Sequence, residues 1–93
     1  MKFKVLQTRR FARQYKKLHD NIAVDVDSAV EAVSIAPSIG ERKKADLAGL
    51  YVYKFRSQGQ QYLLGYTVKE TVRLIYLEAI GPHENFYRDL KRS

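Results

Sequence analysis

The second half of the chain contains three β-rich runs joined by turns of only two residues. The runs are LYVYKFRS, QQYLLGYTV and TVRLIYLEAI, at residues 50–57, 60–68 and 71–80. They are rich in aromatic and aliphatic residues that favour strands. Parallel neighbours need a connection of a dozen or more residues, so turns this short permit only antiparallel pairing. The sequence therefore predicts a three-stranded antiparallel meander.

The first half is predicted to form a short strand at residues 2–7 followed by a two-helix hairpin. Apolar residues recur at helical spacing in both helices. They are Phe11, Tyr15 and Leu18 in the first helix, and Ile22, Val26, Val30 and Val33 in the second. Thr8 is suited to cap the first helix, a capping turn at residues 20–21 opens the second, and Pro37 requires the second to end before it.

The remaining segments are predicted to be a loop and a short terminal helix. Residues 37–49 contain a proline, two glycines and a run of charged residues, which indicates a loop. Pro82 is expected at the first position of a C-terminal helix that packs through Phe86 and Leu90. The whole pattern predicts one α+β domain over residues 1–93: strand, helix hairpin, meander and C-terminal helix.

The charge balance indicates an anionic partner. The chain has 17 Lys and Arg against 10 Asp and Glu, which gives a net charge of +7 and a pI near 9.8. Such a field attracts nucleic acid, although a charge run on a helix is first of all a solvated face. The chain contains no cysteine, which suits a reducing compartment. We find no signal peptide or membrane-spanning run, so a cytoplasmic protein is expected.

The first meander strand places cations side by side. Because side chains alternate across a strand, Tyr51, Tyr53 and Phe55 share one face, and Lys54 and Arg56 share the other. Paired cations on a strand interior indicate a basic surface open to a ligand. An ordinary solvated sheet face is the competing interpretation.

Two polar residues near the C-terminus are candidates for proton transfer. His83 and Tyr87 are one helical turn apart and project together. RNA carries its own nucleophile in the 2′-hydroxyl, so its cleavage requires only a base, an acid and cations around the phosphorane. Lys54 and Arg56 are suited to hold the phosphate. The alternative is that His83 is a surface or capping residue and Tyr87 anchors its helix.

Metal and cofactor chemistry is not predicted. The two histidines, His19 and His83, are not spaced as in metal-binding helices, and the glycines are isolated rather than grouped in a phosphate-binding loop. We therefore expect no metal and no cofactor.

The order of elements, with FARQYKKL in the first helix, YKFRSQG on the first meander strand and IGPHENFYRDLKR at the end, resembles the RelE/ParE superfamily of bacterial toxins. The resemblance implies a toxin of a type II toxin–antitoxin pair in the bacterial cytoplasm. It implies a cognate antitoxin, often acidic, and contact with operator DNA only through that antitoxin. RelE-like members are metal-independent mRNA endonucleases that act on the ribosome, whereas ParE-like members inhibit DNA gyrase. Both functions remain open here.

The resemblance also implies site residues. Lys54 and Arg56 match the RelE-like cation pattern, and His83 and Tyr87 lie where such enzymes place a basic residue and a tyrosine. Two further cations are missing, because the expected positions fall on Val52 and Leu63. The RNA-binding candidates that would replace the lost charge are Lys43, Lys44 and Arg73.

Overall fold

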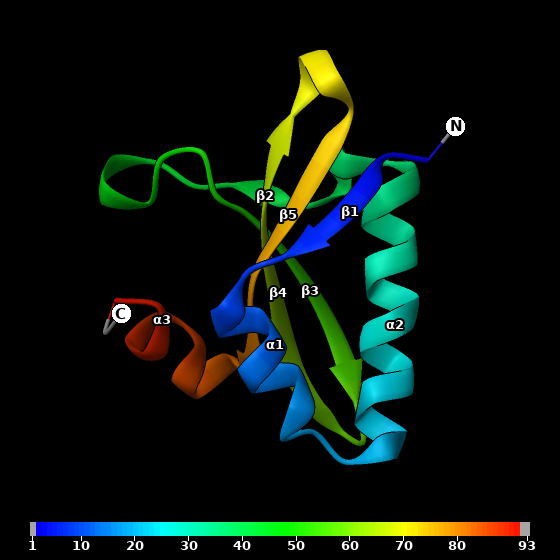
Figure 1. Ribbon diagram of the computed structural model, residues 1–93. Helices are drawn as coiled ribbons and strands as arrows, with labels where there is room; N and C mark the ends of the chain where they lie inside the picture. The colour runs from blue at the N-terminus through cyan, green and yellow to red at the C-terminus, as the bar shows by residue number, and fades with distance from the viewer. Residues whose placement is uncertain (1, 92–93) are drawn as a thin grey trace.

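The computed structural model describes residues 2–91 and confirms the α+β class. In chain order the elements are β1 (Lys4–Gln7), α1 (Arg9–Lys16), α2 (Asp20–Ile35), the 3₁₀ turn η1 (Pro37–Ile39), β2 (Glu41–Arg42), η2 (Ala45–Leu47), β3 (Tyr51–Ser57), β4 (Gln60–Lys69), η3 (Glu70–Val72), β5 (Leu74–Pro82) and α3 (His83–Lys91). Figure 1 shows the two N-terminal helices on one side of the sheet and α3 on the other. The ends of the predicted domain, residues 1, 92 and 93, lie outside the described residues.

The strands form one mixed sheet in the order β1-β5-β4-β3-β2. The β3–β4 and β4–β5 pairs are antiparallel, which confirms the predicted meander. β1 adds to β5 in parallel, with α1 and α2 among the intervening elements, so a long crossover makes the connection. β2 pairs with β3 at the opposite edge. The loop predicted for residues 37–49 therefore contains a two-residue strand that its turn-rich composition concealed.

Several predicted element ends are wrong, and the first strand, β1, begins at Lys4 rather than at residue 2. α2 begins at Asp20, with His19 as its N-cap and no side-chain capping bond, so residues 20–21 are not a capping turn. β4 runs to Lys69 and is followed by η3, so the last strand begins at Leu74 rather than at residue 71. Pro82 closes β5 instead of opening α3. At Asp20 and Pro82 helix formation or pairing includes residue types that are common in turns, whereas Thr71 and Val72, which favour strands, form a 3₁₀ turn.

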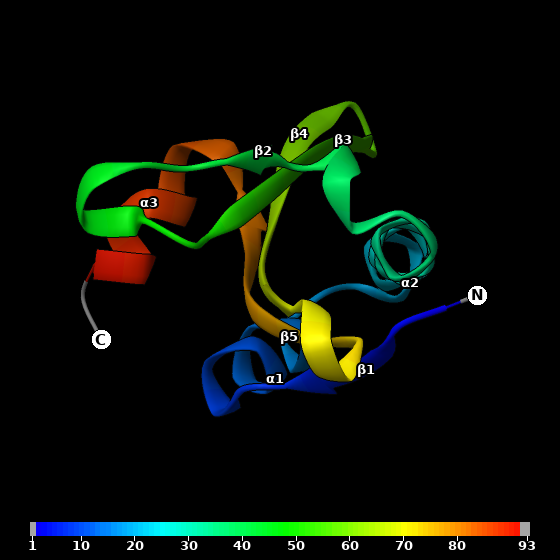
Figure 2. The same cartoon turned by 90° about the horizontal axis from the view of Figure 1, so that it is seen from above.

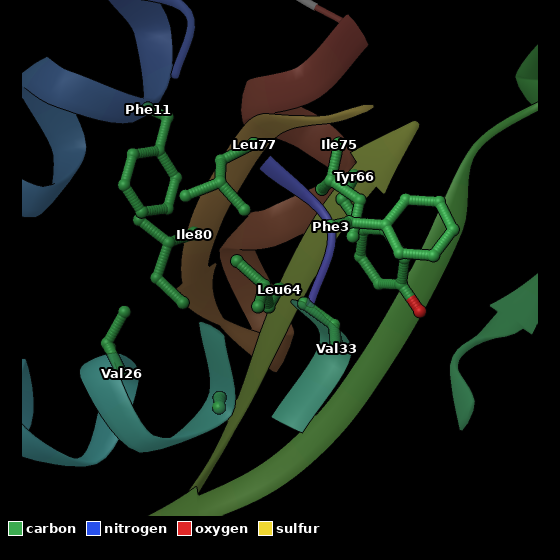
Figure 3. Packing of buried hydrophobic residues seen from close by; sticks show 10 residues of the cluster. Phe3, Phe11, Val26, Val33, Leu64, Tyr66, Ile75, Leu77 and Ile80 are labelled. Atoms are coloured by element: carbon green, nitrogen blue, oxygen red, sulfur yellow. The ribbon is translucent and has the colours of Figure 1, made fainter. Parts of the chain in front are cut away.

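The main core lies between the sheet and the α1–α2 pair (Figure 3). Phe11 from α1 and Val26 and Val33 from α2 meet Leu64 and Ile80 of the sheet. The predicted cap is confirmed, because the Thr8 hydroxyl accepts a hydrogen bond from the Phe11 backbone N–H at 3.2 Å. The same hydroxyl donates to the Leu77 carbonyl at 3.0 Å, so it joins the start of α1 to β5.

A second, smaller core lies on the opposite face, beneath α3. It contains Leu50, Val52, Leu63, Ala79 and Phe86. α3 is amphipathic, and its apolar side covers these residues while its polar side faces outward. No helix among residues 2–91 is long and apolar enough to cross a membrane.

Tyr66 ties the end of the helical layer to the sheet. Its ring is fully buried, and its hydroxyl donates to the Pro37 carbonyl at 2.6 Å and accepts from the Gly40 N–H at 3.1 Å. Burial raises the pKa of Tyr66 to about 12. The hydroxyl is therefore a neutral bridge between β4 and the segment that leads from α2 to β2.

Tyr66→Phe should lower the free energy of unfolding by about 1–3 kcal/mol, because two backbone groups lose a buried partner. Urea unfolding measures this loss. Tyr53→Phe is the matched control, because Tyr53 lies on the same face of the neighbouring strand with its hydroxyl outside the described hydrogen bonds. Equal losses in the two variants would contradict a special role for the Tyr66 bridge.

Tyr66 should also make stability depend on alkaline pH. Its pKa in the folded protein, about 12, exceeds the ordinary value of 10.0, so its contribution is complete below pH 10 and is lost as pH rises toward 12. Comparing the unfolding of the native protein and Tyr66→Phe across this range isolates the effect. The stability difference between the two proteins should shrink as pH rises, and a constant difference would refute the assignment.

Candidate nucleic-acid interface

The sheet face toward α3 carries the cations predicted on β3. Lys54 and Arg56 are exposed on this face, whereas Val52, two residues before Lys54, is 1% exposed. The opposite face of β3 turns Tyr51, Tyr53 and Phe55 toward the main core. The predicted alternation is therefore confirmed, and the cations occupy the part of the strand that α3 leaves uncovered.

Strand register places His83 at the same end of the sheet as Arg56. Arg56 pairs with Gln61 on β4, and Tyr62 pairs with Pro82, the residue immediately before His83. The first turn of α3 is joined to this end, because the Gln60 side chain donates to the Glu84 carboxylate at 2.8 Å. The Arg56 guanidinium donates to the Gly59 carbonyl at 2.7 Å, which turns its side chain toward the β3–β4 turn.

Lys43 contacts Tyr87 in the middle of α3. The Lys43 ammonium lies 5.6 Å from the centroid of the Tyr87 ring and 3.0 Å from a carboxylate oxygen of Glu41. The hydrogen bond to Glu41, and then the Tyr87 hydroxyl, raise the pKa of Lys43. The bond to Lys43 lowers the pKa of Glu41, and the nearby charge of Lys54 adds to that shift. Glu41 thus pairs with Lys43 and interacts electrostatically with Lys54, two of the predicted cations.

The structure assembles part of the predicted set. Lys43 contacts both Glu41 and Tyr87, and Glu41 lies on the same face as Lys54, whereas Arg56 and His83 lie toward the β3–β4 turn. Figure 2 shows α3 and the β2–β3 loop on the same side of the sheet. Glu41 was missed because β2 was taken for loop. Once β2 is known, its pairing with Val52 places it on this face.

Arg73 lies elsewhere. It occupies the turn after η3 with a left-handed backbone, φ 51°, and its guanidinium lies 4.3 Å from the centroid of the Phe3 ring. The nine residues of β5 separate it from His83, which is about 30 Å of extended chain. The structure therefore does not bring Arg73 to the face that carries Lys54.

The two positions that lack cations are apolar for a structural reason. Val52 and Leu63 are 1% and 0% exposed, and both pack in the small core beneath α3. A lysine or arginine there would be buried without a partner, which is strongly unfavourable. Phe86 of α3 packs in the same cluster and occupies the space that such side chains would need.

The family follows from comparison with known proteins. A family model described as ParE-like toxin of type II bacterial toxin–antitoxin system matches residues 5–91. The chain belongs to this toxin family. None of the curated proteins matches it.

Solved structures agree with the toxin's fold. A chain of the intact E. coli RelBE toxin–antitoxin complex superposes with a TM-score of 0.70 and 22% identity, covering 85% of this toxin and 94% of that chain. The RelBE2 complex of Mycobacterium tuberculosis gives a TM-score of 0.73 and 22% identity, covering 89% and 100%. A mutant of the free E. coli toxin RelE gives 0.76 and 20% identity, covering 98% and 92%. At these identities the likeness establishes the fold shared by RelE/ParE toxins.

The close approach of Phe86 to Gly65 allows a direct test of what positions α3 and therefore Tyr87. A Cβ on Gly65 would lie 2.8 Å from the Phe86 ring, so Gly65→Ala should displace α3 and lower the free energy of unfolding by about 1–3 kcal/mol. Gly81→Ala is the matched control, because nothing lies within 4 Å of its Cβ. Urea unfolding of both variants reports stability, and the NMR chemical shifts of Tyr87 report the position of the helix. Equal stability and an equal helix position in the two variants would show that the contact with Gly65 does not position α3.

Proposed function

We propose that this toxin is a metal-independent endoribonuclease that cleaves messenger RNA on the ribosome. The observation that carries the proposal is one sheet face that carries the exposed cations Lys54 and Arg56 and is partly covered by α3, the helix of His83 and Tyr87. Arg56 lies at the end of the sheet where α3 begins at His83. Glu41 is paired with Lys43, which contacts Tyr87, and lies on the same face as Lys54. Cations and proton-transfer groups are the components that cleavage by an internal nucleophile requires.

In the proposed reaction the RNA 2′-oxygen attacks the adjacent phosphorus. His83 accepts the 2′-hydroxyl proton, and a new bond joins the 2′-oxygen to phosphorus. The bond from phosphorus to the 5′-oxygen breaks, and that oxygen takes a proton, leaving a 2′,3′-cyclic phosphate and a 5′-hydroxyl. Lys54 and Arg56 offset the negative charge that develops on the phosphate oxygens. Tyr87, with Lys43 over its ring, supplies a proton or positions a base.

The double variant His83→Ala, Tyr87→Phe should lower RNA cleavage about 100-fold or more, because it removes both proton-transfer groups. Primer extension on messenger RNA in translating extracts, with and without purified toxin, measures the cuts. His19→Ala, Tyr53→Phe is the matched control, because it removes the same functional groups away from this face. Unchanged cleavage in the first variant would eliminate the proposed roles.

A second function, inhibition of DNA gyrase without catalysis, is favoured by the burial of Val52 and Leu63. Those residues leave the face with fewer cations than the RelE-like pattern. A plasmid-supercoiling assay with gyrase distinguishes the two functions. Lost supercoiling with intact RNA would establish the gyrase inhibitor, and cut RNA with normal supercoiling would establish the nuclease.

We further propose that a cognate antitoxin, acidic in its toxin-binding segment, neutralises this protein. The support is the family and the solved RelBE complexes, which are toxin–antitoxin assemblies. The net charge of +7 suits an acidic partner. In this proposal operator DNA is contacted only through the antitoxin.

A further inference from the structure

The loop between β2 and β3 encloses a hollow of about 370 Å³. Its lining consists of Arg42, Lys43, Lys44, Ala45, Ala48 and Gly49. Three consecutive cations therefore line one hollow. Asp46, the acidic residue of the same loop, is not part of this lining.

Backbone hydrogen bonds give the loop a defined shape. The Lys43 N–H donates to the Leu50 carbonyl at 2.8 Å, which closes the loop at its base. Inside it, the Ala48 N–H donates to the Ala45 carbonyl at 3.0 Å. Ala45 and Gly49 adopt positive φ angles of 59° and 89°, which turn the chain around the hollow.

The positive charge around the hollow is only partly compensated. Lys43 is paired with Glu41. Arg42 and Lys44 are exposed, and neither side chain makes an ion pair or hydrogen bond within residues 2–91. A ligand that satisfies both must be an anion, and a phosphate offers the acceptor oxygens that guanidinium and ammonium groups bind best.

The hollow adjoins the candidate nucleic-acid interface. Lys43 lines the hollow and also contacts Tyr87, while Glu41 interacts with both Lys43 and Lys54. Lys43 therefore continues the positive charge of the loop toward Lys54 and Arg56, whereas Arg42, which pairs with Tyr51, leaves the edge strand on the opposite face. A strand of RNA carries phosphates at regular intervals and is the anion that can follow such a path.

We propose that the hollow formed by residues 42–49 binds a backbone phosphate of the RNA strand, next to the phosphate held at Lys54 and Arg56. Arg42 and Lys44 contact this second phosphate, and Lys43 joins the two sites. The proposal rests on the proposed nuclease function for the identity of the strand. Its effect is on RNA binding and register, not on proton transfer.

The test measures binding of a short RNA that is 2′-O-methylated at every position and so cannot be cleaved. Arg42→Ala, Lys44→Ala should weaken binding about five- to tenfold at physiological salt. It should also reduce the slope of log K against log salt by about 0.7, since the hollow holds one phosphate and each lost phosphate contact on a single strand contributes about 0.7. Lys16→Ala, Lys17→Ala is the control, because it removes the same charge from exposed residues of α1 and its end.

Three results would overturn the proposal: no loss of affinity, an equal loss in the α1 control, or weakened binding of an acidic antitoxin segment with RNA affinity intact. Arg42→Lys, Lys44→Arg should restore the affinity, which separates loss of charge from damage to the loop. Cleavage assays are read separately: the Arg42 and Lys44 double variant should raise KM and leave kcat unchanged. If the native protein cleaves no RNA, the nuclease proposal fails, while the uncleavable strand still decides whether this hollow binds a phosphate.

Discussion

The structure depends on β4 being buried on both of its faces. Tyr62 to Tyr66 are five consecutive buried residues, so neither face of the central strand can be left to water. The α1–α2 pair covers one face through the larger core, and α3 covers the other through the smaller one. Because a nine-residue helix covers only part of a sheet, Lys54 and Arg56 remain exposed beside it. The candidate interface is thus the portion of the second face that α3 does not reach.

The sequence predicted the meander and helices because each has a local signal. Two-residue turns imposed antiparallel pairing, and helical spacing of apolar residues marked α1 and α2. β2 carried no such signal, because two charged residues form a strand only when a neighbour offers hydrogen bonds. The position of Glu41 and the hydrogen bond between Gln60 and Glu84 could not be predicted from the sequence for the same reason. Both depend on contacts between residues that are distant in the chain. Alternation along β3 needed no tertiary information, and so the positions of Lys54 and Arg56 could be predicted.

The charges of the fold are segregated in a way that fits an anionic ligand on one side. α1 carries cations over most of its surface, whereas α2 carries carboxylates and no cation. The ion pair of Lys2 with Glu31 and the bond of Tyr15 to Asp27 use part of the negative charge of α2 internally. The β2–β3 loop concentrates positive charge again, beside α3. Two basic surfaces therefore exist, and only the loop surface adjoins the cations of the sheet.

Val52 and Leu63 affect both the packing of α3 and the number of cations on the sheet face beneath it. Apolar side chains at these positions anchor α3 through Phe86, and the same choice removes two cations from the face. What is left is a sparser set in which Lys43 reaches the face from the β2–β3 loop, held by Glu41 and the Tyr87 ring. A cation supplied from a loop is set by the geometry of that loop, whereas a cation on a strand is set by sheet register. In this toxin the spacing between Lys43 and the cations of β3 is therefore governed by how residues 42–49 fold back onto α3.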